Sequence, residues 1–197
     1  MDHFPLYTRL TDTPCLIVGG GDVALRKARL LLRAGAELTI VAPELADELQ
    51  RLVADHGIQV VKDTFNDTHI EAHQFIVAAT SDQSINKQVA AAAKAAMRFC
   101  NVVDDRDLST AIVPAIVDRS PLLITVSTGG NSPVIATRIR QQIEQLLPPA
   151  MADLTVFAGH WRAAVQENID SHDERRRFWQ KLLEGRLTSQ LLDGEIG

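Results

Sequence analysis

This sequence of 197 residues has no long apolar run, no excess of basic charge and only two cysteines. No apolar run approaches the roughly 18 residues that a membrane-spanning helix requires, so we expect no membrane segment. The first residues lack the basic and apolar regions of an export signal, which favours a cytoplasmic location. The formal net charge of −5 argues against nucleic-acid binding, because attraction to phosphates favours a basic surface.

Neither the cysteines nor the histidines form a pattern typical of a disulfide or a metal site. Cys15 and Cys100 fall within apolar runs, so we expect two buried thiols in a reducing compartment. His69 and His73 are four residues apart and could share one face of a helix. However, Ile70 stands where a metalloprotease helix carries glutamate. The sequence therefore predicts no metal site and two solvent-facing histidines.

The first hundred residues alternate between short apolar runs and helical patterns. With 46% hydrophobic and 23% charged residues, the composition is that of an ordinary globular protein. The nearly continuous apolar runs are typical of parallel strands covered on both faces. The predicted strands are 15–18, 38–41, 58–61, 75–78 and 99–103, and the predicted helices are 22–34, 44–56 and 84–97. This order predicts an α/β fold, a Rossmann-type doubly wound parallel sheet.

The pattern changes after Asp104. Apolar runs at 111–113 and 122–126 flank a turn-like stretch and predict a hairpin. Helical patterns follow at 133–147 and 150–169, and a third begins at Ser171 with the spacing of a capping box. We therefore expect three parts: a dinucleotide-binding domain over 1–112, a hairpin and helix region over 113–147, and a helical domain over 148–197.

A glycine-rich segment directly follows the first predicted strand and opens the first helix. It reads Gly19-Gly20-Gly21-Asp22-Val23-Ala24 and fits the pattern G-x-G-x-x-A. In that pattern the first glycine allows a tight turn, the second lets the backbone approach a pyrophosphate, and the small last residue lets helix and strand pack closely. Free amides at the helix start would face the phosphates. The segment predicts dinucleotide binding, and the alternative is a purely structural turn.

The second predicted strand does not end in the acidic residue that usually binds the adenosine ribose. Ala42 and Pro43 occupy that region, and the nearest acid is Glu44, so ribose recognition would fall to these three residues. No arginine stands there to meet a 2′-phosphate, which favours NAD over NADP. Basic runs at 26–29 and 175–177 are either solvated helix faces or sites for a substrate with many carboxylates.

Several short segments occur in an order that resembles a known family. The segments are 4–6, 15–24, 26–28, 78–80, 100–104, 118–122, 129–133 and 174–179. Together they resemble the dehydrogenase–chelatase part of siroheme synthase, also called the precorrin-2 dehydrogenase family. The resemblance extends over essentially the whole chain, and the order of the segments is more specific than any one of them.

The resemblance implies a two-step activity and a homodimer. NAD+ would oxidise precorrin-2 to sirohydrochlorin, and Fe2+ would then be inserted as a substrate to give siroheme. The region from about residue 113 would pair with its copy in a second chain. The resemblance places Thr80, Asn101 and Val102 with the glycine segment in cofactor binding. It assigns the tetrapyrrole to the loop Ser127, Thr128, Gly129, Gly130 and Asn131.

The resemblance also assigns catalysis to Asp104. A carboxylate at the carboxyl end of a parallel strand lies where open α/β sheets bind their ligands. It could accept the proton released during oxidation and later the pyrrole protons that Fe2+ displaces. Successive residues of a strand point to opposite sides, so only one of Asp104 and Asp105 would face the cleft. The alternative role for Asp104 is that of a helix or turn cap.

Two other functions are consistent with the same fold. One is an NAD-sensing regulatory module without catalysis, although no basic winged-helix stretch accompanies it here. The other is a chelatase that performs metal insertion only. Assays of NADH formation and of Fe2+ insertion distinguish the three hypotheses.

Overall fold

The computed structural model describes residues 2–185 and 188–190 of the chain. Two compact units make up the chain, Met1–Val113 and Pro114–Gly197. The expected subdivision of the second half near residue 147 stays a prediction.

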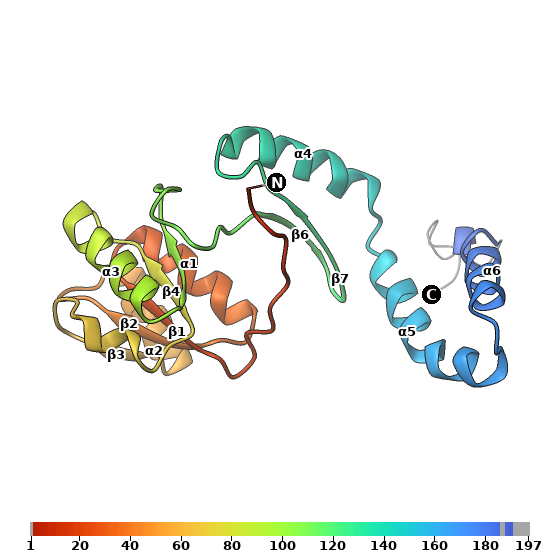
Figure 1. The fold of residues 1–197 in the computed structure, drawn as a ribbon, viewed down its shortest axis with the longest axis horizontal. Coiled ribbons are helices and arrows are strands. Elements are labelled where there is room, and N and C mark those ends of the chain that lie inside the picture. Colours follow the sequence, from red (N-terminus) through yellow and green to blue (C-terminus); the bar gives the residue numbers. More distant parts are fainter. Residues whose placement is uncertain (1, 186–187, 191–197) are drawn as a thin grey trace. The chain divides into compact units, whose positions relative to one another are not determined.

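A five-stranded parallel sheet forms the centre of the first unit, in the order β3-β2-β1-β4-β5 (Figure 1). Its strands are β1 (Pro14–Val18), β2 (Glu37–Val41), β3 (Gln59–Val61), β4 (Phe75–Ala78) and β5 (Phe99–Val102). Val18, at the end of β1, is paired with Val41 on one side and Ala78 on the other, so these three strands end level with one another. The predicted doubly wound parallel sheet is confirmed.

Helices cover both faces of this sheet. They are α1 (Asp22–Arg33), α2 (Asp47–His56), α3 (Gln83–Ala95) and the short 3-10 helix η1 (Asp67–Ile70). Alternate residues of β1 enter different cores: Cys15 and Ile17 pack with residues of α1 and α2, whereas Leu16 and Val18 pack with residues of α3 and η1. Both faces of the sheet are thus buried, which explains the continuous apolar runs in the strands.

Two details of the first unit differ from the sequence-based expectation. The helix expected from residue 44 begins at Asp47, because the preceding loop is held by a hydrogen bond from Ala46 N to the Gly20 carbonyl (2.8 Å). His69 and His73 do not share a helical face. The His69 ring takes part in the capping box of η1, and His73 Nδ1 lies 2.7 Å from the His69 carbonyl oxygen. Both histidines are therefore half-buried rather than solvent-facing.

The two cysteines are fully buried, as expected, and burial raises the pKa of each thiol to about 11. Within the described residues, no group of three or more His, Cys, Asp or Glu side chains could hold a metal ion. Among those same residues, no helix is long and apolar enough to span a membrane.

The second unit starts with a two-stranded antiparallel sheet. It consists of β6 (Ala115–Arg119) and β7 (Leu122–Val126), followed by α4 (Pro133–Leu146), α5 (Met151–Asn168) and α6 (His172–Leu183). The expected strand at 111–113 is wrong. Ala111 N instead donates to the Cys100 carbonyl (3.0 Å), so this segment folds back onto β5. The expected caps are present: Ser132 accepts from Ile135 N, and Ser171 accepts from Glu174 N.

Candidate functional site

A cavity of about 600 Å³ opens at the carboxyl ends of the parallel strands. The chain turns there from each strand toward the next helix, which is where open α/β sheets bind ligands. The cavity is lined by Val18–Val23, Val41–Glu44, Asp63–Phe65, Ala79–Gln83, Ile85, Asn86, Val103 and Asp104. Ten of the predicted site residues are among them: Gly19, Gly20, Gly21, Asp22, Val23, Ala42, Pro43, Glu44, Thr80 and Asp104.

The glycine segment packs so closely against its neighbours that two of its positions have no room for a side chain. A Cβ on Gly19 would lie 2.4 Å from the Ala79 carbonyl oxygen, and the residue has a φ of +127° that strongly favours glycine. A Cβ on Gly20 would lie 1.9 Å from the Glu44 carbonyl oxygen. These two glycines therefore hold the ends of β1, β2 and β4 together.

Gly21 has a different environment. A Cβ built on this residue meets nothing within 4 Å, and its backbone is extended (φ −91°, ψ −169°). It is the N-cap of α1, whose first amides have no side-chain cap. Open space beside unpaired amides at a helix start suits the pyrophosphate of a dinucleotide. The protein itself therefore does not require glycine at position 21, whereas a bound pyrophosphate would.

Thr80 is held in the cavity wall by a buried asparagine that the sequence analysis missed. Thr80 Oγ1 donates to Asn86 Oδ1 (2.8 Å), and Asn86 Nδ2 donates back to the Thr80 carbonyl (3.0 Å). Asn86 is only 5% exposed and lies on α3. The sequence feature that could have identified Asn86 is its position in the first turn of the helix that follows β4.

Acidic side chains surround this cavity. Besides Glu44, Asp63 lines it after β3, another site residue that the sequence analysis missed. The full set of acidic lining residues is Asp22, Glu44, Asp63, Asp82 and Asp104, and no lysine or arginine is among the described residues that line the cavity.

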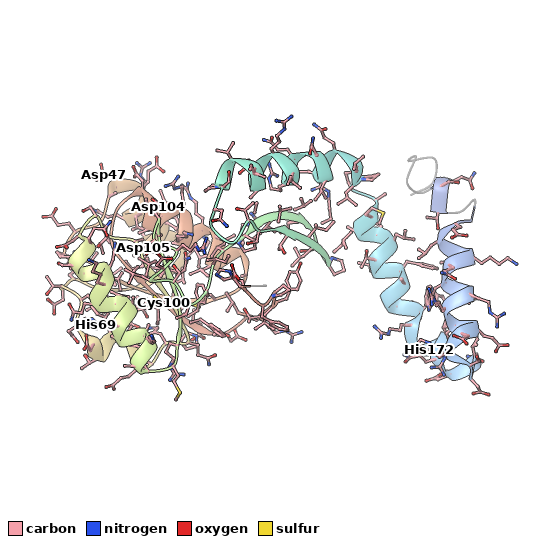
Figure 2. The ribbon with its side chains drawn as sticks, turned by 45° about the horizontal axis from the view of Figure 1, so that its top comes forward. Asp47, His69, Cys100, Asp104, Asp105 and His172 are labelled. Atoms are coloured by element: carbon pink, nitrogen blue, oxygen red, sulfur yellow. The ribbon has the colours of Figure 1, made fainter. Side chains whose placement is uncertain are left out.

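Asp104 and Asp105 follow β5 and lie next to each other in the first unit (Figure 2). Neither belongs to the strand, so strand alternation does not distinguish them. Asp104 lines the cavity, and its φ of +59° is unusual for a residue other than glycine. The Asp105 carboxylate accepts a hydrogen bond from Leu108 N (3.0 Å) and thereby caps the following turn. The Asp105 carboxylate thus stabilises the following turn, whereas Asp104 lies at the cavity wall.

A half-buried lysine lies near Asp104. Lys27 on α1 donates from Nζ to Asn101 Oδ1 on β5 (3.1 Å). Burial lowers the pKa of Lys27 from its usual range, and the nearby Arg26 charge lowers it too, whereas the Asp104 carboxylate opposes both effects. Lys27 therefore belongs to the core side of α1 and not to a solvated basic face.

Three predicted cofactor residues do not line the cavity. Ala24 is fully buried on the inner face of α1, and Val102 is buried in β5. The Asn101 side chain is occupied by Lys27 and by the Ala111 carbonyl, to which its Nδ2 donates (3.1 Å). These residues support the cavity wall from behind.

The predicted substrate loop, Ser127 to Asn131, belongs to the second unit. Its polar groups are largely used within the loop. The Thr128 hydroxyl donates to the Ser132 carbonyl (3.1 Å) and accepts from Ser132 N (3.0 Å), while Gly129 N donates to Ser127 Oγ (3.1 Å). The loop is therefore an ordered turn before α4, not a set of free amides and hydroxyls, and its role in substrate binding stays a prediction.

Three protein families match successive segments of the chain. The family "Putative NAD(P)-binding" matches residues 6–115, "Sirohaem biosynthesis protein central" matches 119–146, and "Sirohaem synthase dimerisation region" matches 150–196. The first match covers more than half of the chain and coincides with the unit that contains the cavity.

Individual relatives agree with these matches. The chain is 44% identical to a siroheme synthase of Tolumonas auensis over 99% of this chain and 41% of that protein. It is 46% identical to siroheme synthase 3 of Aeromonas hydrophila over 93% of this chain and 39% of that protein. The chain thus spans about two fifths of the length of these curated relatives. The solved structure of SirC, a precorrin-2 dehydrogenase, has the same fold, with a TM-score of 0.74, 24% identity and coverage of 93% of this chain and 90% of that one.

Substitution within the glycine segment should separate folding from cofactor binding. We expect Gly21→Val to abolish detectable NAD+ binding with little change in Tm, because its side chain enters only the space left for the pyrophosphate. Gly20→Ala should instead lower the Tm, by about 2–4 °C for each kcal/mol of strain. Calorimetric titration and thermal unfolding of both variants provide the test. A Gly21→Val protein that binds NAD+ normally would contradict this placement of the pyrophosphate.

Proposed function

The chain belongs to the siroheme synthase family, whose NAD(P)-binding, central and dimerisation segments it contains in that order, and we propose that it oxidises precorrin-2 to sirohydrochlorin with NAD+. The observation that carries this proposal is the Asp104 carboxylate in the wall of a cavity suited to a dinucleotide. The same proposal includes Fe2+ insertion into sirohydrochlorin as a second step that is tested separately.

The residues of the cavity fit NAD. The space beside Gly21 and the amides at the start of α1 would take the pyrophosphate. Glu44 and Asp63 provide carboxylates that would accept hydrogen bonds from ribose hydroxyls. Bound NAD+ would supply the acceptor for the hydride that leaves the substrate.

Asp104 would act as the general base. Oxidation of the macrocycle removes a proton together with the hydride, and a carboxylate at the cavity wall can accept that proton. Its exposed position suits it to this role, since it must also release the proton to solvent. Lys27 would act as a positioning residue, because its contact with Asn101 fixes β5 three residues before Asp104.

Fe2+ insertion would use the same carboxylate. Metal insertion displaces protons from pyrrole nitrogens, and Asp104 would accept them in turn. In this step Fe2+ is a substrate that the tetrapyrrole binds, so a resident metal site in the protein is not required.

The family match at 150–196 supports a homodimer as part of the proposal. Large apolar side chains are exposed on α5, among them Val156 (57%), Phe157 (44%) and Trp161 (47%). Phe157 and Trp161 are four residues apart and therefore share one helical face. Burial of such a face against a second copy would remove it from water.

NAD+ should bind more tightly than NADP+. A 2′-phosphate would meet the carboxylates of Glu44 and Asp63 and no lining cation among the described residues, so we expect at least about tenfold weaker binding of NADP+. Calorimetric titration with both cofactors measures the ratio. Equal or tighter binding of NADP+ would refute the proposed preference.

Loss of the Asp104 carboxylate should reduce turnover without loss of cofactor affinity. Asparagine is the better replacement, because it keeps the shape of the side chain and tolerates the positive φ. We expect Asp104→Asn to lose about 10²–10⁴-fold in precorrin-2 oxidation. The matched control is Asp105→Asn, whose amide oxygen can still accept from Leu108 N.

Anaerobic absorbance measurements follow both steps in the same variants. Near-normal oxidation by Asp104→Asn, or an equal loss in both variants, would refute the assignment of the base. Oxidation without Fe2+ insertion by the wild-type protein would remove the second step from the proposal. If the wild-type protein binds NAD+ but performs neither reaction, a regulatory NAD-binding module becomes the better interpretation.

Sedimentation should give about twice the chain mass of 21.6 kDa at micromolar concentration. Phe157→Glu places a charge on the exposed apolar face of α5 and should shift the species toward monomer. Lys181→Glu on α6 changes charge without altering that face and serves as the control. A wild-type monomer under these conditions would refute the proposed dimer.

A further inference from the structure

A second pocket lies in the second unit, between α5 and α6. Its volume is about 490 Å³. It is lined by Thr155, Ala158, Gly159, Arg162, Val165, Gln166, His172, Arg175, Arg176 and Trp179. Neither the family matches nor the proposed reaction assigns a ligand to it.

The lining residues occupy the facing sides of two helices. On α5 they recur at intervals of three and four, as residues on one helical face do, and on α6 His172, Arg176 and Trp179 show the same spacing. Small residues on α5, Ala158 and Gly159, leave the space between the helices open. Phe157 and Trp161, on the exposed apolar face of α5, do not line the pocket, but Trp161 is three residues from Ala158 and four from Val165, so that face borders the pocket.

Positive charge is concentrated in this pocket. Arg162, Arg175 and Arg176 line it, and no aspartate or glutamate is among its described lining residues. The formal charge of the pocket lining is therefore positive, whereas the net charge of the whole chain is −5. An arginine fork can bind a carboxylate with two parallel hydrogen bonds.

The three arginines differ in how the fold uses them. Arg175 joins the helices, since its NH2 donates to the Gln166 carbonyl (3.1 Å) and the Asp170 carbonyl (3.2 Å). Within the part of the chain that the structure describes, Arg162 and Arg176 have no hydrogen bond or ion pair and remain largely exposed. The fold does not use these two guanidinium groups, so they are available to a ligand.

Trp179 adds a flat apolar surface beside the cations. It is half-buried, and its ring contacts Phe178 edge to face. His172 stands at the start of α6 and lines the same pocket (Figure 2). A planar ring system whose edge bears carboxylates matches this combination of an indole surface with two guanidinium groups.

We propose that this pocket binds the carboxylate side chains along one edge of the tetrapyrrole, with Arg162 and Arg176 as the residues that recognise them. The identity of the ligand rests on the proposed function, whereas the anion-binding character of the pocket rests on its own residues. In this proposal the pocket contributes to the affinity and orientation of the tetrapyrrole and takes no part in the proton or hydride transfer.

Direct binding of uroporphyrin, a stable tetrapyrrole with carboxylate side chains, tests the proposal in the full chain. Absorbance titration should show about tenfold weaker binding for Arg162→Gln and for Arg176→Gln, since each removes a charged hydrogen-bonding partner. Arg177→Gln is the matched control, because it removes the same charge from the next residue of α6, which does not line the pocket. Added salt should weaken binding less in the two pocket variants than in the wild type.

Three further readouts distinguish the possible outcomes. The pocket variants should raise the KM for precorrin-2 with little change in kcat, in Tm or in NAD+ affinity. Equal effects of all three arginine substitutions, no effect of the pocket variants, or no uroporphyrin binding by the wild type would overturn the inference while leaving NAD+-dependent oxidation intact. If uroporphyrin binding depends on Arg162 and Arg176 but the wild type does not oxidise precorrin-2, the inference about the pocket is supported and the proposed function is refuted.

Discussion

The close contact between the glycine segment and the ends of neighbouring strands determines the rest of the first unit. Gly19 lies against the Ala79 carbonyl and Gly20 against the Glu44 carbonyl, at distances that exclude even a methyl group. This contact brings the loops after β1, β2 and β4 to one edge of the sheet, where they form a single cavity. Without it, the amides at the start of α1 and the carboxylates of the other loops would not face the same space.

Charge is distributed unevenly between the two units. The cavity of the first unit is lined by acids without a basic residue among its described lining, whereas the pocket between α5 and α6 is lined by arginines without an acid. A dinucleotide binds in the first environment mainly through backbone amides and ribose hydroxyls, so it does not depend on cationic side chains. Carboxylate groups of a ligand would instead be attracted to the arginines of the second environment. The two environments therefore suit different chemical groups.

The sequence predicts the parts that follow from local patterns. The strand–glycine–helix segment identified the five cavity residues 19–23, and the order of apolar runs identified the parallel sheet. It did not predict contacts between residues far apart in the chain. The pairing of Ala111 with Cys100, which replaced an expected strand, depends on a loop that folds back onto β5. Likewise, the difference between Asp104 and Asp105 arises from a turn closed by Leu108 N and not from strand alternation.

The loop that folds back onto β5 has a consequence for ligand affinity. Hydrogen bonds from Ser109, Thr110 and Ala111 to β5, together with the Asp105 cap, fix the backbone on both sides of Asp104 before any ligand arrives. The conformational entropy of this segment is thus lost when the protein folds and not when it binds its ligands. A preorganised carboxylate also needs little rearrangement as charge develops in the transition state. If Asp104 is the base, as proposed, substitutions in residues 108–111, which do not line the cavity, would weaken catalysis by restoring motion at Asp104.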